Sequence, residues 1–66
     1  MSYAVIISNN PRRESVMFNF TNLRDALNSF ITRCDELGYE YREDNNGNFI
    51  AGGLGHDYSI ELISTF

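Results

Sequence analysis

The segment from Asn22 to Leu37 has the clearest pattern of apolar and polar positions in the chain. Its apolar residues recur at intervals of three and four, at Leu23, Ala26, Leu27, Phe30, Ile31, Cys34 and Leu37. At about 100° per residue these positions share one side of a helix, and polar residues occupy the other side. Thr21 or Asn22 can cap the helix, and Gly38 suits its left-handed end. The pattern predicts one amphipathic helix.

Five shorter segments have the alternation or the β-branched content of strands. They are Tyr3–Ser8, Ser15–Phe20, Tyr39–Arg42, Phe49–Ala51 and Asp57–Ser64. The first is apolar on both faces, which is typical of a strand inside a sheet. Pro11 lies in a turn that makes the first two segments an antiparallel hairpin. The pair Asn46-Gly47 predicts a tight two-residue hairpin turn with positive φ angles.

These elements follow one another in the order β-β-α-β-β-β. We expect a single α+β domain over residues 1–66, with one amphipathic helix packed on one face of a mostly antiparallel sheet. The order of the strands within the sheet stays open. The expected core comprises Val5, Ile7, Val16, Phe18, Phe20, Leu23, Leu27, Phe30, Ile31, Cys34, Leu37, Tyr41, Phe49, Ile60 and Leu62.

The composition narrows the classes of partner. Nine acids against five bases give a net charge of −4, so the chain should repel nucleic acid and anionic membranes. A single cysteine allows no intrachain disulfide, and without a Cys/His cluster we expect no metal site and no cofactor. The first residues do not resemble an export signal, and no apolar run has transmembrane length. A cytoplasmic protein is the expectation.

Five acids fall within ten residues, from the last turn of the helix to the turn that follows the next strand. We call Asp35, Glu36, Glu40, Glu43 and Asp44 the acidic patch. Two of them occupy the last helical turn, where the helix dipole disfavours each acid by about 0.3–1 kcal/mol. One interpretation is that the patch binds a basic surface of a partner protein. The alternative is an ordinary solvated surface whose charge serves solubility.

Four apolar residues fall on the face of the sheet that one helix leaves uncovered. They are Ile6, Met17, Ile50 and Ile63. Exposed apolar patches tend to mark interaction surfaces, which indicates a homodimer that packs through Met17, Ile50 and Ile63. A shift of strand register by one residue would instead move some of them inward.

The glycine-rich segment Gly52–Gly55 precedes His56 and Asp57. It could cradle a phosphate, but a strand follows it rather than a helix, so a hairpin loop that needs positive φ angles is favoured. Adjacent strand residues point to opposite faces, so His56 and Asp57 should not touch. Cys34 lies on the apolar side of the helix, where a thiol is normally inert. We expect no enzymatic activity.

The chain as a whole resembles the small, acidic, cofactor-free proteins that bacteriophages make to block host machinery, such as anti-CRISPR proteins. The resemblance rests on size, charge and the lack of catalytic groups, and it implies a protein that occupies a partner's surface. We therefore expect a non-enzymatic protein-binding module, an inhibitor that acts through the acidic patch on a basic partner. The alternatives are a small structural homodimer and a small-ligand or phosphate binder that uses Gly52–Gly55.

Overall fold

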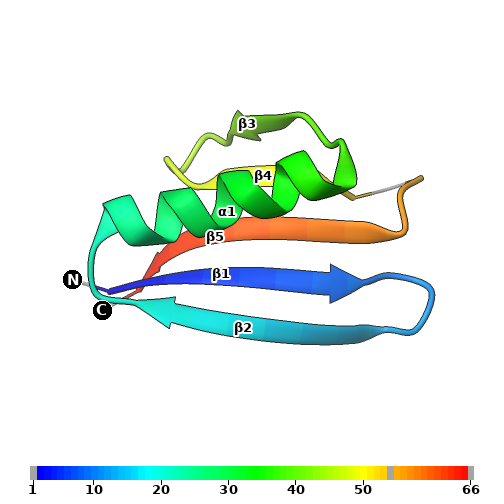
Figure 1. Ribbon diagram of the computed structural model, residues 1–66, viewed down its shortest axis with the longest axis horizontal. Coiled ribbons are helices and arrows are strands. Elements are labelled where there is room, and N and C mark those ends of the chain that lie inside the picture. Colours follow the sequence, from blue (N-terminus) through cyan, green and yellow to red (C-terminus); the bar gives the residue numbers. More distant parts are fainter. Residues whose placement is uncertain (1, 54, 66) are drawn as a thin grey trace.

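The computed structural model describes residues 2–53 and 55–65. One helix packs on one face of a five-stranded antiparallel sheet (Figure 1), and the α+β class and the order of the elements are confirmed. The elements are β1 (Ser2–Asn9), β2 (Glu14–Phe20), α1 (Leu23–Leu37), β3 (Tyr41–Glu43), β4 (Phe49–Gly52) and β5 (Tyr58–Thr65).

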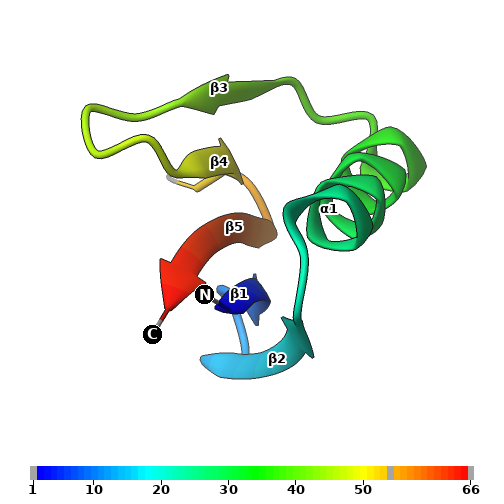
Figure 2. The same ribbon diagram turned by 90° about the vertical axis from the view of Figure 1, so that its left-hand side faces the viewer.

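The strand order within the sheet is β2-β1-β5-β4-β3. The last strand of the chain, β5, lies between β1 and β4, and every neighbouring pair is antiparallel. Viewed along the strands, the sheet rises from β2 to β3 with α1 on one side (Figure 2). The apolar first strand is paired on both edges, as its sequence predicts.

Both predicted helix ends are confirmed. The Asn22 side chain accepts a hydrogen bond of 2.9 Å from the backbone N–H of Asp25, and its amide nitrogen donates to the Asp25 carboxylate. Gly38 closes the helix in the left-handed conformation at φ 71°. The next backbone N–H, that of Tyr39, then donates to the carbonyl of Cys34 at 2.9 Å. These bonds satisfy backbone groups that a helix end leaves unpaired.

The core lies between α1 and the middle of the sheet. Phe30 is fully buried, and its ring meets Tyr41 at 5.6 Å and Phe49 at 6.1 Å between ring centres. The buried cluster around it combines three helix residues with four strand residues: Ala26, Phe30, Cys34, Val5, Ala51, Ile60 and Leu62.

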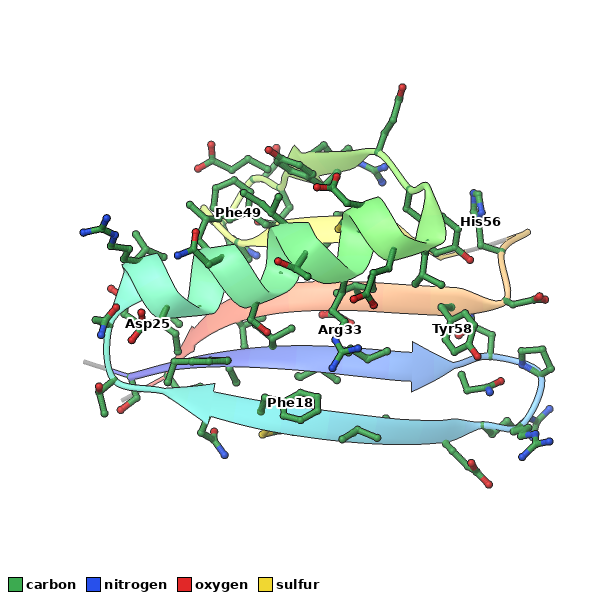
Figure 3. All side chains as sticks on the ribbon, in the orientation of Figure 1. Phe18, Asp25, Arg33, Phe49, His56 and Tyr58 are labelled. Carbon is green, nitrogen blue, oxygen red and sulfur yellow. The ribbon has the colours of Figure 1, made fainter. Side chains whose placement is uncertain are left out.

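The core expected from the sequence contains more residues than the structure buries. Val16, Phe18, Leu23, Leu37 and Tyr41 are all exposed. A helix about 10 Å across covers about two strands spaced 4.8 Å apart, so the edge strands β2 and β3 receive little cover. Phe18 is shielded only in part by Arg33, whose guanidinium carbon lies 5.8 Å from the centre of the ring (Figure 3).

The prediction of a two-residue turn at Asn46-Gly47 is wrong. Gly47 has a φ of 81°, but Asn46 keeps a negative φ. The backbone N–H of Asp44 donates to the carbonyl of Asn48 at 2.7 Å, which makes a longer turn. The Asp44 carboxylate accepts from the backbone N–H groups of Asn46 and Asn48 at 2.8 and 3.0 Å. This local bonding by an aspartate side chain competes with the tighter turn.

Gly52 is the glycine that the fold requires most directly. It has a φ of 72°, and a Cβ added there would clash with the carbonyl oxygen of Tyr58 and approach the Tyr39 ring to 3.0 Å. Gly38 has nearly the same φ, 71°, but a Cβ there would meet nothing within 4 Å. An alanine at either position would strain the backbone, but only an alanine at Gly52 would also clash with neighbouring atoms.

We predict that Gly52→Ala lowers the free energy of unfolding by at least about 3 kcal/mol, whereas Gly38→Ala lowers it by about 1 kcal/mol. Urea unfolding followed by circular dichroism measures both values. Equal losses in the two variants would show that the Tyr58 carbonyl moves aside without penalty.

Candidate functional site

The five acids of the acidic patch do not share one environment. The Glu36 carboxylate forms an exposed ion pair of 3.4 Å with Arg33. Asp44 is half-buried and caps the β3–β4 turn. Both arrangements could have been predicted from the sequence. The ion pair has the i,i+3 spacing of neighbours on a helix, and aspartate commonly hydrogen-bonds the backbone of its own turn.

The two acids of the acidic patch that belong to α1 lie on different sides of the helix. Arg33, and Glu36 with it, lies on the side of α1 that faces β2 (Figure 3). Asp35 is about 200° around the helix from Arg33, so it lies on the opposite side, toward β3. Glu40 precedes β3 and Glu43 is its last residue, and both are exposed. Asp35, Glu40 and Glu43 therefore lie on the β3 side of the structure, which we call the β3 edge, whereas Glu36 lies on the β2 side.

The carboxylates at the β3 edge carry no ion pair. Among residues 2–53 and 55–65, the one salt bridge is that between Arg33 and Glu36. Arg42 lies in β3 between these acids, but it pairs with Ile50 and points to the face opposite the helix. Asp35, Glu40 and Glu43 thus project unneutralised negative charge from a chain that is already acidic.

The strand register places the four apolar residues of the other sheet face together, with Met17 exposed and Ile6, Ile50 and Ile63 half-buried. Met17 pairs with Ile6, and Ile63 lies on the same face next to Ala4. The pairing also places Glu61 on this face, directly between Ile6 and Ile50. A dry face-to-face dimer would have to bury the Glu61 carboxylate, which is costly unless a cation pairs with it.

Backbone hydrogen bonds within the glycine-rich loop and to the start of β5 stabilise this loop. Gly52, Gly53 and Gly55 all have positive φ angles, as the hairpin interpretation predicts. The N–H of Gly53 donates to the Tyr58 carbonyl at 3.1 Å, and that of His56 donates to the Gly53 carbonyl at 3.0 Å. These N–H groups are therefore not free to bind a phosphate. Leu54, the remaining member of the segment, lies outside the described residues.

Asn10 anchors this loop to the first hairpin, a role that its sequence position did not reveal. Its side-chain nitrogen lies 3.0 Å from the carbonyl oxygen of His56 and 3.3 Å from that of Gly53. Its backbone N–H donates to the Asp57 carbonyl at 2.8 Å. Asparagine in a turn ordinarily bonds its own backbone, so contacts more than 40 residues away in the chain depend on the fold.

A cavity of about 360 Å³ lies beside His56, where α1 ends and β3 begins. Glu40 and Arg42 line it, and the His56 ring packs against Tyr39 with 4.7 Å between ring centres. His56 and Asp57 both lie in the bend before β5 rather than on a strand, and no hydrogen bond joins them among the described residues. The cavity gathers polar groups, and none of the described residues that line it is a serine, threonine, cysteine or lysine.

Comparisons with protein-family models, with curated proteins and with solved structures found no match to this chain. No helix in the described part of the chain is long and apolar enough to cross a membrane.

Cys34 is fully buried among core residues. Burial raises the pKa of its thiol, and the charge of the neighbouring Asp35 raises that pKa further. A thiol kept protonated and inaccessible is a poor nucleophile. Its place on the apolar side of the helix was predicted from sequence.

We predict that Cys34 reacts with a thiol reagent at least about a hundredfold more slowly in the native protein than in urea, because reaction requires an opening of the fold. A Cys34→Ala variant carrying Asn28→Cys, an exposed position on the same helix, should react at similar rates in both states. Equal native rates for Cys34 and the Asn28→Cys control would contradict the burial of Cys34.

The raised pKa of the Cys34 thiol also makes the free energy of unfolding depend on pH. The thiol ionises more readily in the unfolded chain, so the free energy of unfolding should fall as pH rises past about 8.5. Cys34→Ala should remove this part of the pH dependence, which thermal melts between pH 7 and pH 10 can measure.

Proposed function

We propose that this chain is a non-enzymatic protein-binding module that inhibits a partner by occupying a basic surface on it. The observation that carries the proposal is the group of three unpaired carboxylates at the β3 edge, Asp35, Glu40 and Glu43. Exposed charges of one sign attract a surface of the opposite sign and speed its association.

The β3 edge also has the accessibility that such binding needs. All three residues of β3 are exposed, and the turn that follows it reaches out on the side of the sheet away from α1 (Figure 2). A partner can therefore approach the carboxylates of this edge without any rearrangement of the fold. Basic surfaces suited to it include those that ordinarily bind nucleic acid, because phosphate and carboxylate attract the same arginine and lysine side chains.

The homodimer through Met17, Ile50 and Ile63 stays a prediction. The shared sheet face favours it, and the position of Glu61 on that face counts against it. Small-ligand or phosphate binding at the glycine-rich loop also stays a prediction. It draws support from the cavity beside His56 and loses support because the N–H groups of Gly53 and His56 are already bonded.

The test compares two double variants that change the net charge equally. Glu40→Gln with Glu43→Gln removes two carboxylates at the β3 edge, and Asp57→Asn with Glu61→Gln removes two carboxylates that lie outside both the β3 edge and β2. Asp44 is left intact because its side chain caps a turn. A tagged pull-down from nuclease-treated lysate of the source cell or its host identifies the partner, which is then purified for affinity measurements.

We predict that the β3-edge variant binds the purified partner at least about tenfold more weakly in 0.15 M salt, which corresponds to about 1.4 kcal/mol. The control variant should bind as the wild type does, and thermal melts should show both variants folded. Wild-type affinity of the β3-edge variant would overturn the acidic patch as the binding surface.

A further inference from the structure

The two edges of the sheet differ in how they are protected against pairing with another strand. The β3 edge is three residues long and carries the charges of Arg42 and Glu43, and short, charged edges resist further pairing. The β2 edge is seven residues long, its one charge is that of Glu14 at its start, and the six residues that follow contain neither a charge nor a proline. The β2 edge therefore lacks the common protections.

Apolar side chains are exposed on both faces of β2. Val16 is 55% exposed and Phe18 38% exposed on the helix-side face, and Met17 is 54% exposed on the opposite face. In Figures 1 and 2 no described element runs along the outer edge of β2. Its outer backbone groups and its exposed apolar residues form one continuous surface that another strand can cover.

We propose that the β2 edge binds the β2 edge of a second copy of this chain. The two strands pair antiparallel about a two-fold axis at Met17. Two five-stranded sheets then join into one continuous sheet with both helices on the same face.

The sequence of β2 is complementary to itself in this register. Met17 faces Met17 of the second copy, Val16 faces Phe18, and Ser15 faces Asn19. Pairs of aromatic and β-branched residues opposite each other contribute roughly 0.2–1 kcal/mol each. Glu14 faces Phe20, so no like charges stand opposite each other along the paired strands.

Edge pairing also agrees with the position of Glu61. Joined at β2, the two sheets place the Met17–Ile6 pair of one copy beside that of the other, while Glu61 stays in solvent. A face-to-face dimer would bury Glu61 instead. For a chain of 66 residues with one cysteine, added burial and added backbone hydrogen bonds are a means of stabilisation that its own core does not supply.

The first experiment measures mass by light scattering over a range of protein concentrations. The wild type should reach the mass of two chains. Val16→Lys, an exposed change on the helix-side face of β2, should weaken dimerisation at least tenfold. Ile50→Lys, a change on the opposite face, should leave the dimer intact, and circular dichroism checks the folding of both variants.

The second experiment tests the register and does not depend on the folding of Val16→Lys. In a Cys34→Ala background, Met17→Cys should form a disulfide-linked dimer with oxidised glutathione, because the two residues meet at the axis. Asn19→Cys on the same face should not, since it faces Ser15 of the second copy.

Three results would overturn the proposal. The first is a wild type that keeps the mass of one chain at every concentration. The second is a dimer that Ile50→Lys disrupts and Val16→Lys does not, which would identify the face-to-face arrangement. The third is crosslinking of Asn19→Cys in preference to Met17→Cys.

Discussion

The packing of one helix against one face of a five-stranded sheet governs the rest of this structure. The helix α1 lies over the middle of the sheet, where Val5 and Ile60 are completely buried beneath Phe30 and Cys34. Its width matches about two strands. Burial therefore falls away toward both edges, and the far face of the sheet stays uncovered.

Because the helix covers only the middle of the sheet, the edge strands β2 and β3 remain exposed, and they differ in chemistry. The β3 edge carries unpaired carboxylates, and the β2 edge carries apolar side chains together with outer backbone groups that no described strand pairs with. The two proposals use opposite ends of the sheet and are compatible. A dimer joined at β2 would hold the two β3 edges at its outer ends, where each remains open to a basic partner. Two linked binding surfaces can raise overall affinity without new contacts in either one.

The sequence predicted the candidate site only in part. It located the five acids of the acidic patch and placed Ile6, Met17, Ile50 and Ile63 on one face, because strand alternation is a local property. It did not reveal that Glu36 pairs with Arg33 or that Asp44 caps a turn, although helix spacing and turn chemistry contain both signals. It could not show that Glu61 falls between Ile6 and Ile50, because those neighbours come from strands distant in the chain.

Local patterns by themselves determined the elements of this protein: the helix with its Asn22 cap and Gly38 end, the order of the elements along the chain, and which side chains of a strand share a face. These features depend on residues within a few positions of one another. The tertiary structure alone decided that β5 enters between β1 and β4, that Asn10 holds the loop at Gly53 and His56, and that Val16, Phe18 and Tyr41 remain exposed. An apolar residue in an alternating strand has the same local signature in the centre of a sheet and at its edge, because burial depends on what packs above it.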